Sequence, residues 1–142
     1  MIAPGRPLLV PNDLFVATAW WTAQMVKFAV RNTVQKTFIY LIQDFEPILH
    51  EGSTFHARAL ETYGLPHIPV INTKLLFDHF RDSKVGCYMD PAFASEALFF
   101  EPALDRNYYY SDPGRPRSSG KKTLLFYARP TAARRNLFEI GL

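Results

Sequence analysis

TFIYLI, residues 37–42, is the stretch that decides the fold, because β-branched and aromatic residues in such a run form a buried strand. The residues that follow are QDFEP, positions 43–47, and Pro47 stops the strand. Elsewhere along the chain, short apolar runs bounded by polar residues alternate with longer segments of helical period. This alternation is typical of βα units that feed a parallel sheet.

The segments on either side of this strand fit the same pattern. Upstream, an apolar run at 14–18 predicts a strand, and apolar residues at helical spacing predict a helix over about 20–31. Downstream, residues 52–54 can cap a helix over about 55–63, and Gly64 stands where a left-handed residue is wanted after a helix.

A third unit follows at once. We expect a strand at 67–71, with Asn72 and Thr73 as the cap of a helix over 74–80. Beyond Ser83 the pattern loosens and leads to a short strand at about 97–100. Three successive βα units predict an α/β layered domain.

Composition and charge describe an ordinary globular protein. The chain has 142 residues, 48% of them hydrophobic, and its net charge of only +3 speaks against a polycation that coats nucleic acid. The single cysteine, Cys87, rules out an internal disulfide and suits a reducing compartment. The longest candidate for a membrane span, residues 14–30, is interrupted by polar side chains. We therefore expect a cytoplasmic protein, with peripheral contact to a membrane surface left open.

The C-terminal segment holds a second group of residues suited to ligand binding. An apolar strand is expected at 124–127, followed by a turn with Arg129 and by a helix that opens with Arg134 and Arg135. Unpaired N–H groups and cationic side chains converge at such a place, which is a standard way to hold phosphate. Adjacent arginines in a first helical turn oppose the helix dipole unless an anion lies between them and the helix end. The alternative is that they face water or pair with acidic groups elsewhere.

This segment also suggests how the chain is divided. One strand and one helix cannot make a domain, so we interpret residues 121–142 as the truncated start of a second domain. Residues 113–120 are rich in Pro, Gly and Ser and are interpreted as a linker, which leaves 1–112 as a partial first domain. The amino-terminal residues contain three prolines and no Gly-rich turn, so we expect βα units to be missing there as well.

Polar residues follow the central strand. Asp44 and Glu46 form an acid-x-acid pair, which at a strand end can hold a divalent cation and diphosphate, line a polar cleft or lie on plain surface. We predict no metal site, because one cysteine cannot build a thiolate zinc site and no His-x-x-x-His spacing occurs. His56, at a helix start, is a candidate general base or ligand contact.

Two further kinds of side chain invite interpretation. Trp20 is expected at the carboxyl end of a strand, where open α/β sheets bind ligands, and its ring could stack on a sugar. Trp21 is expected in the core. Cys87 is expected to be a packed thiol, because nothing near it in the sequence would lower its pKa.

Several of these stretches carry a family resemblance that covers the chain from about residue 13 to 142. They are VATAWWTA at 16–23, YLIQDFEP at 40–47, GS at 52–53, ETY at 61–63, FYARP at 126–130 and ARRNLFE at 133–139. Together they resemble the sugar-nucleotide-dependent glycosyltransferases of the GT-B architecture, which has two Rossmann-like domains. Within that group they resemble the bacterial rhamnosyltransferases that build surface polysaccharides.

The resemblance implies a fold and a reaction. The fold is a Rossmann-like three-layer parallel sheet, as a partial N-terminal, acceptor-side GT-B domain, plus the first βα unit of a C-terminal domain that binds the nucleotide-sugar. The reaction is transfer of a sugar, rhamnose from dTDP-rhamnose, to a glycan acceptor. No cofactor and no nucleic-acid partner are implied.

The resemblance also implies site residues. In such enzymes two cations grip the donor diphosphate, and by similarity Arg129 takes the first place and Arg135 the second, with Arg134 as the alternate. This chain has Ala128 where Gly is usual and Arg-Asn where Lys-Gly is usual. Trp20 and Glu46 are expected to contact the substrates. The catalytic base is not identified, and His56 and Asp44 are its candidates.

Two other classes stay open. A non-enzymatic, flavodoxin-like module that binds a nucleotide or a protein would need the strand at 124–127 to join the same sheet as the first three. A nucleic-acid binder is motivated by the basic residues at 115, 117, 121 and 122, but no recognition motif supports it. A solvated basic linker accounts equally well for Arg115 and Arg117.

Overall fold

The computed structural model describes residues 9–103, so residues 1–8 and 104–142 lie outside the description. The linker at 113–120 and the strand and helix expected within 121–142 are therefore not tested. Whether residues 124–127 join the sheet is likewise open, and with it the distinction between a second domain and a flavodoxin-like module.

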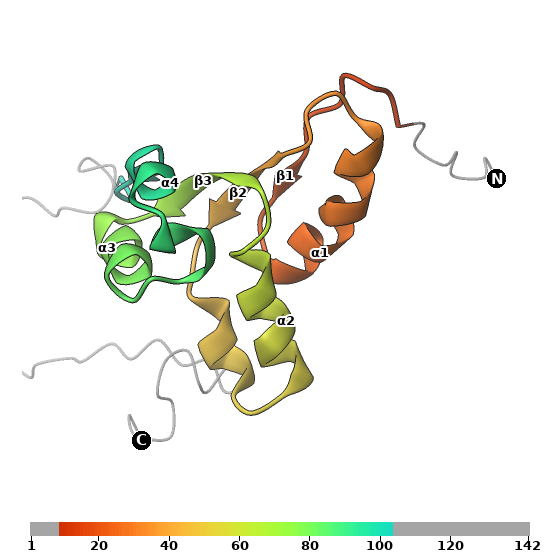
Figure 1. The fold of residues 1–142 in the computed structure, drawn as a ribbon. Helices are drawn as coiled ribbons and strands as arrows, with labels where there is room; N and C mark the ends of the chain where they lie inside the picture. Colours follow the sequence, from red (N-terminus) through yellow and green to blue (C-terminus); the bar gives the residue numbers. More distant parts are fainter. Residues whose placement is uncertain (1–8, 104–142) are drawn as a thin grey trace, which may run out of the picture. The chain divides into compact units, whose positions relative to one another are not determined.

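A four-stranded parallel sheet with the strand order β1-β2-β3-β4 forms the centre of the described part (Figure 1). Its strands are β1 (Val16–Ala17), β2 (Phe38–Ile42), β3 (His67–Asn72) and β4 (Leu98–Phe100). The register between β2 and β3 runs from Phe38 opposite His67 to Ile42 opposite Ile71. The prediction of an α/β fold with a Rossmann-like parallel sheet is confirmed.

Helices link the strands in the order expected of βα units. They are α1 (Trp20–Ala29), α2 (Thr54–Thr62), α3 (Lys74–Asp82) and the short α4 (Pro91–Ser95), with 3₁₀ turns η1 (Val30–Asn32), η2 (Glu46–His50) and η3 (Gly86–Met89). The helix expected over 20–31 ends at Ala29 and tightens into η1. No helix within residues 9–103 has the length and apolar character that crossing a bilayer demands.

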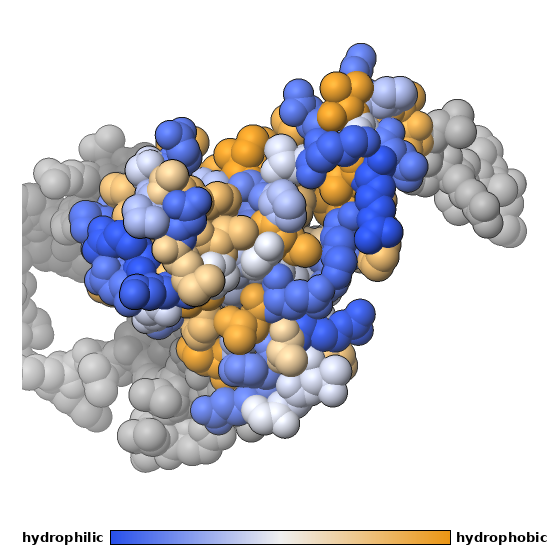
Figure 2. Space-filling view, viewed as in Figure 1, coloured by the Kyte–Doolittle hydropathy of each residue, from blue (hydrophilic) through white to orange (hydrophobic). Residues whose placement is uncertain are grey.

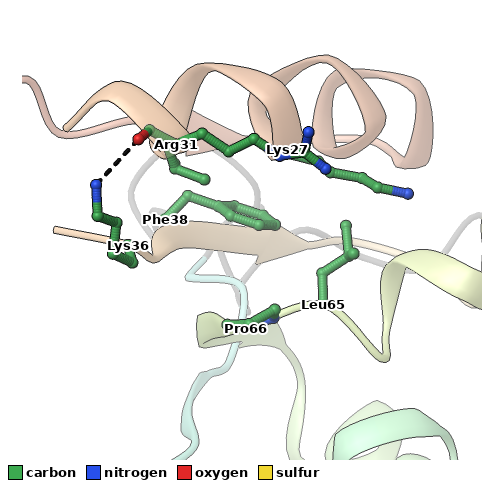
Figure 3. A pocket seen from close by; sticks show the side chains of 7 residues that line it. Lys27, Arg31, Lys36, Phe38, Leu65 and Pro66 are labelled. Carbon is green, nitrogen blue, oxygen red and sulfur yellow. Dashed lines mark hydrogen bonds between the residues drawn. The ribbon is translucent and has the colours of Figure 1, made fainter.

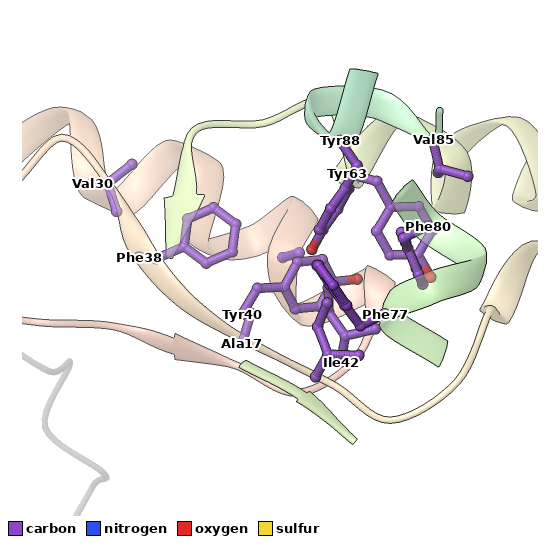
Figure 4. Close-up of a cluster of buried hydrophobic side chains, with 12 residues drawn as sticks. Ala17, Val30, Phe38, Tyr40, Ile42, Tyr63, Phe77, Phe80, Val85 and Tyr88 are labelled. Carbon is purple, nitrogen blue, oxygen red and sulfur yellow. The ribbon is translucent and has the colours of Figure 1, made fainter. Parts of the chain in front are cut away.

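The core lies between one face of the sheet and the helices. Phe38, Tyr40 and Ile42 alternate along β2 with their side chains buried on this face (Figure 4). The Tyr40 hydroxyl is 3.1 Å from Thr62 Oγ1 of α2, which anchors that helix to the middle of the sheet. The rest of the cluster is Ala17, Ala23, Val30, Tyr63, Ile71, Phe77, Phe80, Val85 and Tyr88.

The opposite face of the sheet is apolar but open among the described residues. By register its side chains are those of Val16, Ile39, Leu41, Ile68, Val70, Leu98 and Phe100. Val16, Ile68, Leu98 and Phe100 are exposed, and the other three are half-buried. A parallel sheet is normally covered by helices on both faces. The described residues thus supply two of the three expected layers.

Two glycines, neither of them Gly64, adopt the left-handed conformation. Gly64 has no positive φ, and α2 instead ends in tight turns in which the Gly64 N–H donates to the Glu61 carbonyl at 3.0 Å. The left-handed glycines are Gly52, with φ 65°, and Gly86, with φ 53°. The prediction for Gly64 is therefore wrong, because successive turns satisfy the end of α2 without that conformation.

Gly86 has a second reason to be glycine. A Cβ atom on it would lie 2.3 Å from the Tyr63 carbonyl oxygen. The next residue, Cys87, donates its N–H to that same oxygen at 2.9 Å. Close approach of two backbone segments is thus what places η3 against the end of α2.

Candidate functional site

The carboxyl ends of β1 and β2 meet the first turn of α1 and the turn η2. The carboxylate of Glu46 accepts a hydrogen bond from the Trp20 backbone N–H at 2.6 Å. The Trp20 indole Nε1–H donates to Nε2 of His50 at 3.2 Å. The structure therefore brings together Trp20 and Glu46, which the sequence placed only at the same edge of the sheet.

Glu46 closes the amino-terminal end of α1. The residue before that helix is Ala19, which has no side-chain oxygen with which to cap it. The Thr22 hydroxyl accepts the Ala19 N–H at 3.0 Å, and Glu46 accepts the N–H of Trp20. A carboxylate at this position satisfies an unpaired N–H group and complements the positive end of the helix dipole.

The same arrangement recurs at α3. The Lys74 N–H donates to Glu101 Oε1 at 2.9 Å, and the Thr73 side chain accepts the Leu76 N–H at 3.2 Å, which confirms Thr73 as the predicted cap. Thr73 has φ 83°, an unusual conformation for a β-branched residue. Two helix ends at this edge therefore carry their own carboxylates, and a carboxylate repels a diphosphate. The edge is better suited to a neutral, hydroxyl-bearing ligand.

Buried Tyr63 holds the loop that carries both acids. The Glu46 N–H donates to the Tyr63 hydroxyl, and that hydroxyl donates to the Asp44 carbonyl, each at 3.3 Å. Burial raises the pKa of Tyr63 well above its usual range, so the hydroxyl keeps its proton. Phe45 between the two acids stacks on the Tyr63 ring at 5.9 Å. The loop from Asp44 to Glu46 is thereby fixed to the end of α2.

His56 is oriented by its neighbours at the start of α2. Its backbone N–H donates to the Ser53 hydroxyl at 3.3 Å, which confirms the predicted cap. Its ring Nδ1 lies 2.9 Å from the Pro47 carbonyl oxygen. Because a carbonyl only accepts, Nδ1 must carry the proton, and Nε2 of the neutral ring keeps its lone pair. A neutral His56 ring therefore offers Nε2 as its basic nitrogen.

His50 is a residue of the candidate site that the sequence analysis missed. Its ring packs edge-on against Trp20 at 5.7 Å and against Phe55 at 5.9 Å. Trp20 is only 8% exposed, whereas Trp21 is 53% exposed, so the expectation of a core position for Trp21 is wrong. The role of Trp20 in ligand binding stays a prediction. The residues around His50 in the sequence gave no indication that its ring would contact Trp20 of α1.

Asn72 and Asp44 are further polar residues at this edge. Asn72 ends β3, and its Oδ1 atom is buried with no hydrogen-bond partner within residues 9–103. A buried carbonyl in this state can accept a hydroxyl group of a ligand. Asp44 is half-buried beside Glu46. Within the same range, no group of three or more His, Cys, Asp or Glu side chains is arranged to hold a metal ion.

The remaining predicted residues lie away from this edge or outside the description. Arg129, Arg134 and Arg135 are outside the described residues, so their convergence on a diphosphate is untested. Burial raises the pKa of the Cys87 thiol, whose Sγ donates to the Leu65 carbonyl at 3.6 Å. Cys87 is therefore a packed thiol, as predicted.

A basic hollow lies at the other end of β2. It has a volume of about 260 Å³ and is lined by Lys27, Arg31, Lys36 and apolar residues around Phe38 (Figure 3). Lys36 Nζ donates to the Arg31 carbonyl at 3.0 Å, and Lys27 pairs with Glu61. Two of the three cations are thus already engaged, Lys36 with the turn after α1 and Lys27 with Glu61 of α2.

Two similarities to known proteins bear on the carboxyl edge. Residues 6–74 match the family model described as WsaF, N-terminal domain. The chain is also 37% identical over 135 residues to the O-antigen biosynthesis protein RfbC of Myxococcus xanthus, a match that covers 95% of this chain and 9% of that protein. The chain thus spans less than a tenth of the length of that relative. Trp20, Glu46, His50 and His56 all fall inside the stretch that is similar to the WsaF domain.

Proposed function

We propose that the chain is the acceptor-side part of a GT-B glycosyltransferase that transfers a sugar to a glycan in bacterial surface-polysaccharide synthesis. The observation that carries this proposal is the match of residues 6–74 to the WsaF N-terminal domain, because that stretch holds the contacts of Trp20 with Glu46 and His50 and also holds His56. The similarity to RfbC, which is named for O-antigen biosynthesis, supports the same class of product.

The proposed donor is dTDP-rhamnose, on the strength of the family resemblance. Its diphosphate would be held by Arg129 and Arg135, with Arg134 as the alternate, at the start of a second domain. The geometry of the described edge supports this division of labour. Glu46 and Glu101 occupy the helix ends that a diphosphate would otherwise use, so the donor charge has to be neutralised by another part of the protein.

The proposed chemistry is direct displacement by an acceptor hydroxyl. Nε2 of His56 takes the hydroxyl proton while the oxygen forms its bond to the anomeric carbon, and the bond from that carbon to the diphosphate oxygen breaks. The arginines stabilise the charge that develops on the departing diphosphate. The hydrogen bond from Nδ1 to the Pro47 carbonyl keeps the ring in the tautomer that this step requires. Asp44 is the other candidate for the base.

The test is sugar transfer by the two-domain enzyme that this proposal implies, with dTDP-rhamnose offered beside other nucleotide-sugars. Loss of the general base in His56→Ala should lower kcat by about 10²–10⁴-fold, and Asp44→Asn should have a much smaller effect. Glu96→Gln, on the exposed end of α4, is the control. Full activity of His56→Ala together with an inactive Asp44→Asn would transfer the role of base to Asp44.

The donor assignment has its own test. Arg129→Ala and Arg135→Ala should each weaken binding of the nucleotide-sugar, and unchanged affinity in both would remove the diphosphate assignment. The chain of 142 residues alone should be inactive, because most of the donor site would lie in the second domain. Sugar transfer by that chain would contradict the proposed division into two domains.

A further inference from the structure

Asn72, the last residue of β3, places an amide beside apolar side chains. Ile71 is fully buried under the helices, so by strand alternation the side chain of Asn72 lies on the open face of the sheet. By register Asn72 stands beside Phe100 of β4, whose side chain is 44% exposed on the same face. The other two side chains that β3 places on this face, Ile68 and Val70, are apolar. Asn72 is therefore the single polar group of β3 on the open face.

The side-chain carbonyl of Asn72 has no donor within residues 9–103. Its Oδ1 atom is buried and makes no hydrogen bond in that range. The other buried side-chain oxygen of this kind there is Asp78 Oδ1, which pairs with Arg81 Nη1 at 3.0 Å. A buried carbonyl without a donor is costly, because it has given up its hydrogen bonds to water. Such groups are rare in native proteins and call for a partner.

The turn after Asn72 is held by bonds to β4 and to the residue that follows it. The Thr73 N–H donates to the Phe100 carbonyl at 2.7 Å, and the Lys74 N–H donates to Glu101 Oε1 at 2.9 Å. Thr73 itself has φ 83°, which a β-branched residue seldom adopts. Strained residues persist where the surrounding structure enforces them, and they cluster at ligand sites. Asn72 thus has a fixed place at the carboxyl edge of the sheet.

The chemistry of this edge selects the group that can donate to Asn72. A carbonyl oxygen only accepts, so the partner must bring an N–H or O–H proton. A diphosphate brings none when fully ionised, and the carboxylates of Glu46 and Glu101 at the two helix ends repel it. A sugar carries hydroxyl groups beside apolar ring faces, and an aromatic ring such as that of Phe100 can pack against those faces. In the view of Figure 2, hydrophobic patches likewise lie between the hydrophilic surfaces of α1 and α3.

We propose that Asn72 is a specificity-determining residue of the candidate site, whose side-chain carbonyl accepts a hydrogen bond from a ring hydroxyl of the acceptor sugar. The assignment to the acceptor rests on the proposed function, in which this part of the protein holds the glycan. Asn72 takes no part in proton transfer. It selects among sugars by the position of one hydroxyl, because only a sugar with that hydroxyl satisfies the buried acceptor.

The first experiment is titration of the chain with methyl α-L-rhamnopyranoside, followed by NMR, beside the analogues that each lack one ring hydroxyl. We expect one analogue to bind about three- to tenfold more weakly than the parent sugar, which is the loss of one hydrogen bond. In Asn72→Leu, which has a similar size and no acceptor, the parent sugar and that analogue should bind equally weakly. Asn32→Leu, the same change at an exposed position in η1, is the matched control and should bind as the wild type does.

A conservative variant and a measurement without sugar separate this role from a structural one. Asn72→Asp keeps an acceptor oxygen, so it should still discriminate against the same analogue. Asn72→Leu removes an acceptor that the free protein leaves unpaired, so the urea midpoint of unfolding should stay the same or rise. A lower midpoint would show that another part of the protein donates to Asn72. That result would overturn the proposal, as would no binding of the parent sugar by the wild type or equal binding of all analogues.

Failure of this inference can be told apart from failure of the proposed function. In the two-domain enzyme that the function implies, Asn72→Leu should raise KM for the acceptor about three- to tenfold and leave KM for the nucleotide-sugar unchanged. Sugar transfer with an unchanged acceptor KM in this variant would overturn the role of Asn72 and leave the function standing. If the enzyme transfers no sugar, the proposed function fails, and the titration with the analogues still decides whether Asn72 recognises a hydroxyl.

Discussion

Replacement of Gly86 by alanine should be the most damaging single-methyl change in the described part of the chain. Gly86 has φ 53°, and an added Cβ would meet the Tyr63 carbonyl oxygen at 2.3 Å and its carbon at 2.4 Å. Both are backbone atoms, so η3 must move away from the end of α2. Overpacking of this kind costs about 1–3 kcal/mol, and the left-handed conformation adds about 1 kcal/mol for a residue with a Cβ.

The other glycines of the described part provide matched controls. Gly52 has φ 65° but nothing within 4 Å of an added Cβ, so Gly52→Ala should cost only about 1 kcal/mol. Gly64 has an ordinary φ and a nearest contact at 3.4 Å, so Gly64→Ala should change stability by less than about 0.5 kcal/mol. The expected order of destabilisation is Gly86, then Gly52, then Gly64.

The assay is urea unfolding of the three variants beside the wild type, followed by circular dichroism. Gly86→Ala should lower the free energy of unfolding by about 2–4 kcal/mol, which corresponds to a fall in Tm of about 10–20 °C for a domain of this size. The difference between Gly86→Ala and Gly52→Ala isolates the backbone clash from the strain of a left-handed residue. A difference below about 0.5 kcal/mol would refute the claim that contact with Tyr63 makes Gly86 irreplaceable.

Three further predictions concern the core and the carboxyl edge. Burial lowers the pKa of His67, and its neutral ring contacts the Leu65 carbonyl and the Tyr88 hydroxyl. As the pH falls, the unfolded chain therefore takes up a proton at this residue before the folded protein does, and the free energy of unfolding should fall below about pH 6.5. A plot of Tm against pH should be flatter for His67→Gln. Glu46→Ala should cost about 0.5–2 kcal/mol by removing the acceptor of the Trp20 N–H, and Glu46→Gln about 0.3–1 kcal/mol, in thermal unfolding. Equal losses in both would show that only the charge matters. Tyr63→Phe should cost about 0.5–1.5 kcal/mol and speed hydrogen exchange at the Glu46 amide, whereas unaltered exchange there would argue against the Tyr63 anchor.

The sheet was predictable because each strand can be recognised from the residues within and next to it. The run at 37–42 is short, apolar and followed by proline, and the structure has β2 at Phe38–Ile42. Caps were equally local, since Ser53 and Thr73 bond to residues three positions ahead. The short elements η2, η3 and α4 were missed, because a single turn of helix leaves too little periodicity to detect.

The features that the sequence did not predict depend on contacts between residues that are distant in the sequence. Nothing near Gly86 in the sequence reveals that the Tyr63 carbonyl will lie against it. Trp20 and Trp21 are neighbours, and which of them is buried follows from the bond of Trp20 to His50 across the fold. The acidic pair was recognised, yet the use of Glu46 to close α1 follows from the spatial meeting of β1 and β2.

The apolar side of the sheet, which residues 9–103 leave open, has a practical consequence for work at the bench. Ile68, Leu98 and Phe100 are each more than 40% exposed there, alongside Val16. The purified protein should therefore bind fluorescent dyes that report exposed hydrophobic surface, and it should aggregate as its concentration rises. Charged replacements at Ile68 and Leu98 should keep it dispersed without touching the side that packs on the helices, which offers a route to crystals and to spectra of a well-behaved sample.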